Sequence, residues 1–245
     1  MQSFYAMLLT LFLASASLPA LTTSLIIPCH YKHAQHLHAL LKAYEKQTVM
    51  PDEVVVAISE FNKVDPSVID TLREQKWKFS FTMIVSEQPK TAGENRNSAC
   101  EKARGDIFIL QDADDLPHPQ RIEIVKYFFE QYQVNHIIHQ FISAPTEQRR
   151  YRVVAYDLHK IPYLHPATIS DIIIGFFALD TNTIGGYTHG HVAITRELFK
   201  DIQWDNKKLG QDMRFTEAVY KKNKSPLILQ VPLIVYRHYL SSHKP

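Results

Sequence analysis

The chain has 245 residues, enough for one large domain or two small ones. A hydrophobic content of 45% and a charged content of 21% are typical of an ordinary globular protein. The formal net charge of +2 gives no reason to expect a surface that binds nucleic acid. Two cysteines, Cys29 and Cys100, cannot form a disulfide framework, and we expect both to be free thiols.

The N-terminal segment differs from the rest of the chain. Residues 4–21 are uncharged and mostly apolar, and the triplets A-S-A and L-P-A offer cleavage sites of the A-x-A kind. We predict a signal peptide or signal anchor over residues 1–21, with an exported or membrane-anchored protein in the secretory pathway. Membrane association would then run through residues 4–21. If the segment is instead a buried N-terminal helix, we expect a cytoplasmic protein.

Residues 24–133 alternate between short apolar runs and segments whose apolar residues recur at helical spacing. The apolar runs predict strands at residues 24–28, 53–58, 78–85 and 107–110. The helical spacing predicts helices at residues 33–46, 66–75, 94–103 and from 118 onward. This alternation indicates a mainly parallel sheet flanked by helices, with right-handed crossovers.

Beyond residue 134 the pattern is looser. It predicts extended or apolar segments at residues 134–142, 152–158, 172–179, 192–194 and 228–236. Glycines at 185, 186 and 190 predict a flexible loop, and a helix is expected to begin near Gly210. No internal repeat or low-complexity linker interrupts the chain. We therefore predict one α/β domain over residues 22–245, divided into halves at 22–133 and 134–245.

Three carboxylates follow the apolar run at residues 107–110 within the stretch QDADDLP. In an extended segment Asp112 and Asp114 would point the same way and Asp115 the other. Two carboxylates that converge at the end of a buried strand repel each other unless a cation lies between them, and a hard divalent cation suits oxygen ligands. An isolated D-x-D is more often a solvated acidic turn. Its position here, at the edge where α/β sheets bind ligands, favours a binding site.

Five segments, in this order, resemble the family 2 glycosyltransferases with the GT-A fold. They read SLIIPCHYKH, PDEVVVAISE, AGENRNSACEKARGDIFILQDADDLPHPQRI, GGYTHGHVAITRELF and GQDMRF. The long central block is the most specific, because an Arg-Asn pair, a buried strand, D-x-D-D and H-P follow one another in family order. The resemblance implies a GT-A-like domain with a Rossmann-like, nucleotide-binding donor half at residues 22–133 and an acceptor half at 134–245. It also implies a glycosyltransferase of the hexosyl or N-acetylhexosaminyl type.

The resemblance further implies a nucleotide-diphosphate sugar donor and a divalent cation, Mn or Mg. A cation that bridges the two phosphates would stabilise the charge on the leaving phosphate. Asp114 would coordinate the metal, with Asp115 as an orienter or second ligand and His238 as an imidazole ligand.

Five residues are implied to surround the nucleotide sugar, namely Pro28, His30, Glu60, Arg96 and Asp112. Asp112 would reach the ribose, and the guanidinium of Arg96 suits phosphate anions. The alternative for Arg96 is a salt bridge on a helix surface. The adjacent Asn97 is expected to cap or brace the turn.

The family usually places its general base in a Glu-Asp pair at the start of a helix. Here the pair reads Gln211-Asp212, so the resemblance implies that Asp212 takes the proton from the acceptor hydroxyl in an inverting transfer. The alternative is that Asp212 only caps the helix after Gly210. The acceptor would be a glycan, a lipid or a protein.

One departure from the family lies at the end of the second strand. Family members commonly carry Asp-Asp-Gly-Ser there, whereas this chain reads Ile-Ser-Glu-Phe at 58–61, with Glu60 as the only acid. The identity of the nucleotide base is therefore open. A catalytically degenerate, secreted binding module is the main alternative function; Gln211 and this departure favour it, and the retained Asp112, Asp114 and Asp212 oppose it. A sugar-nucleotide pyrophosphorylase would need a Gly-rich loop after the first strand, and residues 29–32 contain no glycine.

Overall fold

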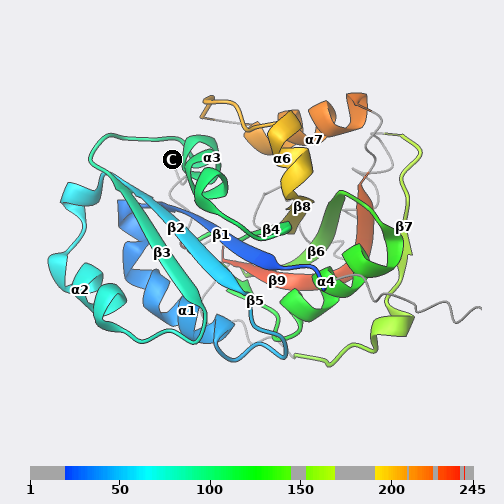
Figure 1. The fold of residues 1–245 in the computed structure, drawn as a ribbon, viewed down its shortest axis with the longest axis horizontal. Coiled ribbons are helices and arrows are strands. Elements are labelled where there is room, and N and C mark those ends of the chain that lie inside the picture. The colour runs from blue at the N-terminus through cyan, green and yellow to red at the C-terminus, as the bar shows by residue number, and fades with distance from the viewer. Residues whose placement is uncertain are drawn as a thin grey trace, which may run out of the picture.

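The computed structural model describes residues 20–144, 153–168, 191–208, 210–222, 226–237 and 240. Nearly all of the predicted signal segment, the apolar run at 172–179, the three loop glycines and His238 lie outside these residues. In the described part, the strands form one sheet in the order β3-β2-β1-β4-β8-β6-β9-β5, and β7 pairs with β9 (Figure 1). No helix within the described ranges is long and apolar enough to cross a membrane.

Residues 22–133, the predicted donor half, confirm the predicted alternation of strands and helices. Its strands are β1 (Thr23–His30), β2 (Glu53–Ser59), β3 (Ser80–Ser86) and β4 (Ile107–Leu110). Its helices are η1 (Tyr31–His36), α1 (Leu37–Tyr44), η2 (Phe61–Lys63), α2 (Pro66–Glu74), α3 (Ala92–Lys102) and α4 (Arg121–Tyr132). All pairs among β1 to β4 are parallel, as predicted. The helix predicted from residue 33 begins instead as a 3-10 turn, because the chain bends after β1 before α1 starts.

The acceptor half is a mixed extension of the same sheet. Its strands are β6 (His136–Ala144), β7 (Tyr163–Leu164), β8 (Val192–Thr195) and β9 (Leu227–Arg237), and β9 also pairs with the short strand β5 (Leu116–Pro117), which follows β4 within residues 22–133. Its helices are η3 (Leu158–Lys160), α6 (Arg196–Asp201) and α7 (Gln211–Lys221). Strand β8 runs antiparallel to both β4 and β6, and therefore joins the two halves.

The segment predicted to be extended at 152–158 is described from residue 153 onward, and it forms no strand. Residues 153–157 pair with no strand in the described part of the chain, and a 3-10 turn follows at 158–160. The segment is held instead by side chains at the start of α4. The Gln120 side chain accepts from the Tyr156 N–H at 2.8 Å, and a His118 ring nitrogen lies 3.1 Å from the Val154 carbonyl. Apolar residues without a neighbouring strand then remain exposed, as Val153 does at 59%.

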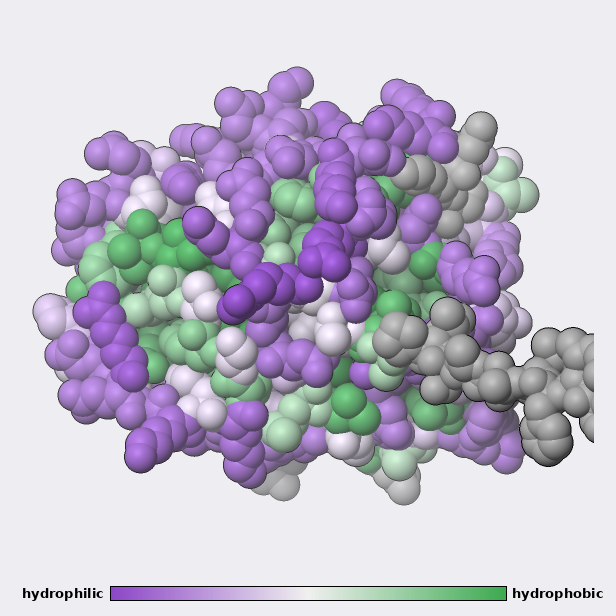
Figure 2. Space-filling model, in the orientation of Figure 1, coloured by the Kyte–Doolittle hydropathy of each residue, from purple (hydrophilic) through white to green (hydrophobic). Residues whose placement is uncertain are grey.

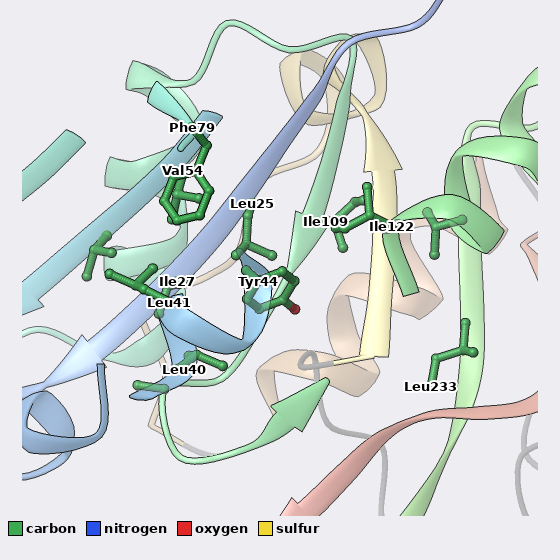
Figure 3. Packing of buried hydrophobic residues seen from close by; sticks show 14 of the residues in the cluster. Leu25, Ile27, Leu40, Leu41, Tyr44, Val54, Phe79, Ile109, Ile122 and Leu233 are labelled. Atoms are coloured by element: carbon green, nitrogen blue, oxygen red, sulfur yellow. The ribbon is translucent and has the colours of Figure 1, made fainter. Parts of the chain in front are cut away.

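The core lies on both faces of the sheet, because successive strand residues point to opposite sides. Leu25 and Ile27 pack with α1, α2 and α4, whereas Ile26 packs with α3, α6 and α7. Figure 1 shows the two groups of helices on opposite sides of the sheet, and Figure 3 shows the first of the two clusters. Both cysteines are buried and free, as predicted.

Strand β3 is the edge of the sheet and is covered only in part. Phe79, just before the strand, is 7% exposed, whereas Val85 near its end is 43% exposed. Trp77 stacks on Phe79 with ring centroids 5.8 Å apart and lies at the same distance from the Phe81 ring. Figure 2 shows hydrophobic residues gathered over this edge, bordered by hydrophilic residues. The rings cover the start of the strand, and its end lies open.

Candidate functional site

The three acids after β4 lie on a turn at the carboxyl end of the parallel strands. Strand β4 ends at Leu110, and the N–H of Asp115 donates to the Asp112 carbonyl at 3.2 Å. The side chains of Asp112 and Asp114 are 21% and 13% exposed, whereas Asp115 as a residue is 1% exposed. The side chain of Asp115 thus differs in direction from the other two because of the turn, and not because side chains alternate along an extended strand. Two of the three carboxylates are therefore partly exposed.

One buried guanidinium joins the two halves of the site. Arg96 comes from α3, and its Nη2 lies 2.9 Å from Oδ1 of Asp112. Its Nη1 lies 3.7 Å from Oδ1 of Asp212 on α7. Arg96 is 4% exposed, so the alternative of a salt bridge on a helix surface is wrong. Its Nε is buried without a hydrogen-bond partner among the described residues.

Helix α3 also holds the segment that leads into α7. The Asn97 side chain donates to the Trp204 carbonyl at 2.8 Å and accepts from the Trp204 N–H at 3.1 Å. Asn97 therefore braces a segment 107 residues further along the chain, and not the turn before α3, which Thr91 caps. A Cβ on Gly93 would lie 2.5 Å from the Asp205 carbonyl oxygen, so only glycine allows this approach. These contacts fix where α7 begins, and with it the position of Asp212.

The start of α7 explains the Gln-Asp pair. Gly210 is the N-cap in a left-handed conformation (φ 68°), and Asp212 is the second residue of the helix. The alternative that Asp212 is the cap is therefore wrong. Gln211 is 5% exposed, and its amide donates to the Lys207 carbonyl. A glutamate could not donate this bond, which gives a physical reason for the amide at this position.

Asp114 and Asp115 are held by partners that sequence reasoning did not assign to the site. Oδ2 of Asp114 lies 3.2 Å from Nδ1 of His33, a residue of η1 that is 8% exposed. Burial alone would raise the pKa of Asp114, but the hydrogen bond and charge of His33, together with a backbone hydrogen bond and the charge of Arg237, outweigh burial and lower the pKa. From β9, the Arg237 N–H donates to Oδ1 of Asp115 at 3.0 Å, and the Arg237 guanidinium contacts the Asp114 carbonyl. The one signal for His33 in the sequence is its place three residues after His30, at the end of the first strand.

Asp115 lies in a setting that favours its neutral form. Burial raises the pKa of this carboxyl well above its usual range, and the charges of Asp114 and Asp112 raise it further. Its Oδ2 is buried and has no hydrogen-bond partner within the described part of the chain. The structure thus places Asp115 as a buried residue behind the two partly exposed acids, and a role as metal ligand stays a prediction.

The remaining predicted residues lie at the ends of β1 and β2. Nε2 of His30 lies 2.8 Å from Oε2 of Glu60, which adopts a left-handed conformation (φ 52°) just after β2. Lys63 contacts the other oxygen of Glu60, and its ammonium lies 5.2 Å from the Tyr31 ring centroid. Pro28 is buried within β1, beside Ala57 of β2. These residues lie along the same carboxyl edge as the three aspartates, because all four donor-half strands are parallel.

The described side chains do not by themselves form a metal centre. No group of three or more His, Cys, Asp or Glu side chains within the described ranges could hold a metal ion. Asp114, His33 and the unpartnered oxygen of Asp115 nevertheless supply ligand types that a divalent cation accepts. The residues therefore fit a cation only if it takes further ligands from a bound molecule.

Comparisons with known proteins agree with this geometry. The family model described as "Glycosyl transferase family 2" matches residues 24–202. A curated protein of Haemophilus influenzae, described as "Uncharacterized glycosyltransferase", is 31% identical over 117 residues, which cover 47% of this chain and 37% of that protein. The chain thus matches little more than a third of the length of this relative.

Solved structures of S. aureus TarS show the same fold. TarS 1-349 in complex with UDP is 18% identical and has a TM-score of 0.65, with 88% of this chain and 60% of that chain covered. TarS 1-349 in complex with UDP-GlcNAc is 18% identical with a TM-score of 0.66, covering 91% and 62%. At this identity the likeness shows the predicted GT-A-like fold alone.

Proposed function

Because the chain belongs to glycosyl transferase family 2, we propose that it transfers a sugar from a nucleotide-diphosphate donor to an acceptor hydroxyl. One observation carries the proposal. Asp112 of the donor half and Asp212 of the acceptor half lie on two nitrogens of the buried Arg96 guanidinium. A transferase needs its donor site and its proton acceptor close together, because the acceptor oxygen must attack the sugar carbon while the donor is held.

The donor would lie along the carboxyl edge of β1, β2 and β4. Pro28, His30 and Glu60 would contact the nucleoside, and Asp112 the ribose, with Arg96 close to the phosphates. The TarS structures contain UDP and UDP-GlcNAc, which supports a uridine nucleotide and an N-acetylhexosaminyl or hexosyl donor for this chain.

A divalent cation, Mn or Mg, would lie beside Asp114. When bound, it would neutralise charge on the diphosphate and so help the nucleotide to leave. Asp114 supplies an ionised carboxylate there, since its pKa is lowered in spite of burial, with His33 holding one oxygen. Asp115 would support this residue from below or act as a second ligand, and His238 is proposed as an imidazole ligand.

Asp212 would act as the general base of an inverting reaction. A carboxylate that faces the site from the first turn of α7 can accept the proton of the attacking hydroxyl. Arg96 would orient Asp212, because its Nη1 lies 3.7 Å from Oδ1 of that carboxylate. The acceptor, a glycan, lipid or protein, would approach from the acceptor half, and residues 1–21 would direct the protein to the secretory pathway or the membrane.

The test is nucleotide release from a panel of UDP-, GDP- and dTDP-sugars with Mn or Mg, together with UDP titration by calorimetry. We expect turnover with one donor class and metal-dependent binding of its nucleotide. Asp114→Ala should abolish metal-dependent binding, whereas the exposed Glu197→Ala should match wild type. Nucleotide binding without any turnover or transfer would favour the degenerate binding module instead. If no nucleotide binds in the presence of metal, the proposed function is wrong.

A further inference from the structure

A fully buried arginine lies directly beneath the acidic turn. Arg121 is the first residue of α4 and is 0% exposed. Its Nη1 donates to the Tyr44 hydroxyl and to Oε1 of Gln111, both at 2.8 Å, and its Nη2 donates to the Leu110 carbonyl at 2.6 Å. Its Nε donates to Nε2 of His139 at 3.0 Å. One side chain thus connects α1, the end of β4 and β6.

This network reaches the backbone of Asp112. The Tyr44 hydroxyl donates to Oε1 of Gln111 at 2.6 Å, so the Gln111 oxygen receives two hydrogen bonds. The side-chain nitrogen Nε2 of Gln111 then donates to the Asp112 carbonyl at 2.8 Å. Because Arg121 also holds the Leu110 carbonyl, three consecutive residues at the exit of β4 are tied to one guanidinium. Figure 3 shows Tyr44 within the core, with its hydroxyl oxygen at the end of the ring that points away from α1.

On the acceptor side the network ends at an irregularity of the sheet. The pairing of β6 with β9 shifts register at His139 and Gln140. A guanidinium can only donate, so Nε2 of His139 must accept, and the proton on Nδ1 donates to the Gln140 carbonyl at 2.9 Å. Burial and the charge of Arg121 hold the pKa of His139 well below its usual range, which keeps this tautomer neutral. After the shift, β9 continues to Arg237, which holds Asp114 and Asp115 from the other side.

We propose that Arg121 is a positioning residue of the donor site, acting through Tyr44 and Gln111 to hold the backbone from Leu110 to Asp112. The role rests on the proposed function, because Asp112 matters only if a nucleotide binds there. Arg121 itself is fully buried and would not touch the donor. Together with Arg237, it clamps both ends of the acidic turn, so that Asp112 and Asp114 keep their places when a ligand displaces Arg96 or His33.

A purely structural role would give a different result from a positioning role, and the chain offers a matched pair of variants to separate them. Tyr44→Phe removes one buried hydroxyl that donates to Gln111 and accepts from Arg121. Ser24→Ala removes one buried hydroxyl that donates to Glu53 at 2.5 Å and accepts from the Gly105 N–H at 2.8 Å. Each change deletes two buried hydrogen bonds, one pair beneath the acidic turn and the other at the opposite end of the same strands.

The experiment measures thermal unfolding, UDP binding with Mn by calorimetry, and amide hydrogen exchange over residues 110–115. We expect both variants to lose a similar amount, about 3–6 °C in Tm. Tyr44→Phe should weaken UDP binding about tenfold, as expected for one lost buried contact, and should speed exchange at 110–115. Ser24→Ala should bind UDP within about twofold of wild type, with unchanged exchange there.

Equal UDP affinity in the two variants, or unchanged exchange at 110–115 in Tyr44→Phe, would overturn the positioning role. Wild-type protein that binds no nucleotide would contradict the proposed function but not the clamp, because the exchange measurement decides the clamp without a ligand. The two failures are therefore distinguishable.

Discussion

The two ends of the donor-half strands both carry acids, and they hold them in different ways. At the amino end, each acid accepts from a backbone N–H and a hydroxyl. Oδ2 of Asp52 accepts from the Thr23 N–H at 2.7 Å and from its hydroxyl at 2.9 Å. Oδ2 of Asp106 accepts from the N–H and the hydroxyl of Thr22 in the same way. At the carboxyl end, Asp112 and Asp114 are held by the side chains of Arg96 and His33.

The difference distinguishes acids that hold the strands in place from acids that can serve a ligand. A hydrogen bond from a backbone N–H cannot be broken unless the strand moves, so the acids at the amino end fix the positions of the strands. A side chain such as Arg96 can rotate or exchange its partner for a phosphate, so the acids of the carboxyl end can serve a ligand. Sequence composition alone does not distinguish these two sets of carboxylates. The predictions below test the distinction, from the largest effect to the smallest.

At the carboxyl end, Asp212→Asn should lower the transfer rate by about a hundred- to ten-thousand-fold, as expected when a general base is removed. Asparagine keeps the size of the side chain and cannot take a proton at neutral pH. Nucleotide binding should stay within a few-fold of wild type, because the donor is held by the other half. The measurement is kcat at saturating donor and acceptor; a rate within threefold of wild type would show that Asp212 is not the base.

At the amino end, Glu53→Gln should lower the free energy of unfolding by about 2–3 kcal/mol and leave nucleotide affinity unchanged. Oε1 of Glu53 accepts from the Ser24 hydroxyl and the Gly105 N–H, and the residue is 7% exposed. The charge that strengthens these bonds is lost in the amide. Denaturant unfolding, with the exposed Asp70→Asn as control, measures the effect; weaker nucleotide binding in Glu53→Gln would contradict the separation of the two ends.

Replacing the buried Asp115 by its amide should stabilise the fold, whereas the same change at Glu53 should destabilise it. The pKa of its carboxyl is raised in the folded protein, so the folded state holds the proton to higher pH, and the stability contributed by Asp115 falls as pH rises above the unfolded value. Without metal, Asp115→Asn should therefore be about 1 kcal/mol more stable than wild type at pH 7. Tm measured from pH 4 to 7 in chelator should show the difference vanish near pH 4. A variant less stable than wild type at pH 7 would contradict the prediction.

The smallest effect is expected for Asp106→Asn. Hydrogen bonds from the N–H and hydroxyl of Thr22, with Arg196, lower the pKa of Asp106, so its stabilisation is present at neutral pH and is lost as pH falls through the folded pKa. The side chain is 41% exposed, and solvent screening limits the contribution to about 0.5 kcal/mol or less. The variant should match wild type in strong acid and be slightly less stable at pH 7. An effect as large as that of Glu53→Gln would be inconsistent with this screening.

The pattern of apolar residues was sufficient to predict the donor half. Runs such as residues 53–58 and 107–110 are apolar throughout because parallel strands are buried on both faces, and this information is local. The acidic turn was also visible, since it stands directly after the strand predicted at 107–110. The sequence carried no such local signal for β5 and β7, which are two residues long and exist because they pair with β9.

The contacts that make the site were decided only by the tertiary structure. Arg96 meets Asp212 because α3 holds the segment before α7, and His33 meets Asp114 because β1 and β4 are adjacent and parallel. Arg121 reads as an ordinary helix residue in the sequence, yet the fold buries it beneath the acidic turn. Such pairs depend on which elements become neighbours, and no periodicity along the chain records that choice. Local burial therefore determines the strands, and the packing of elements distant in sequence determines which side chains can act together.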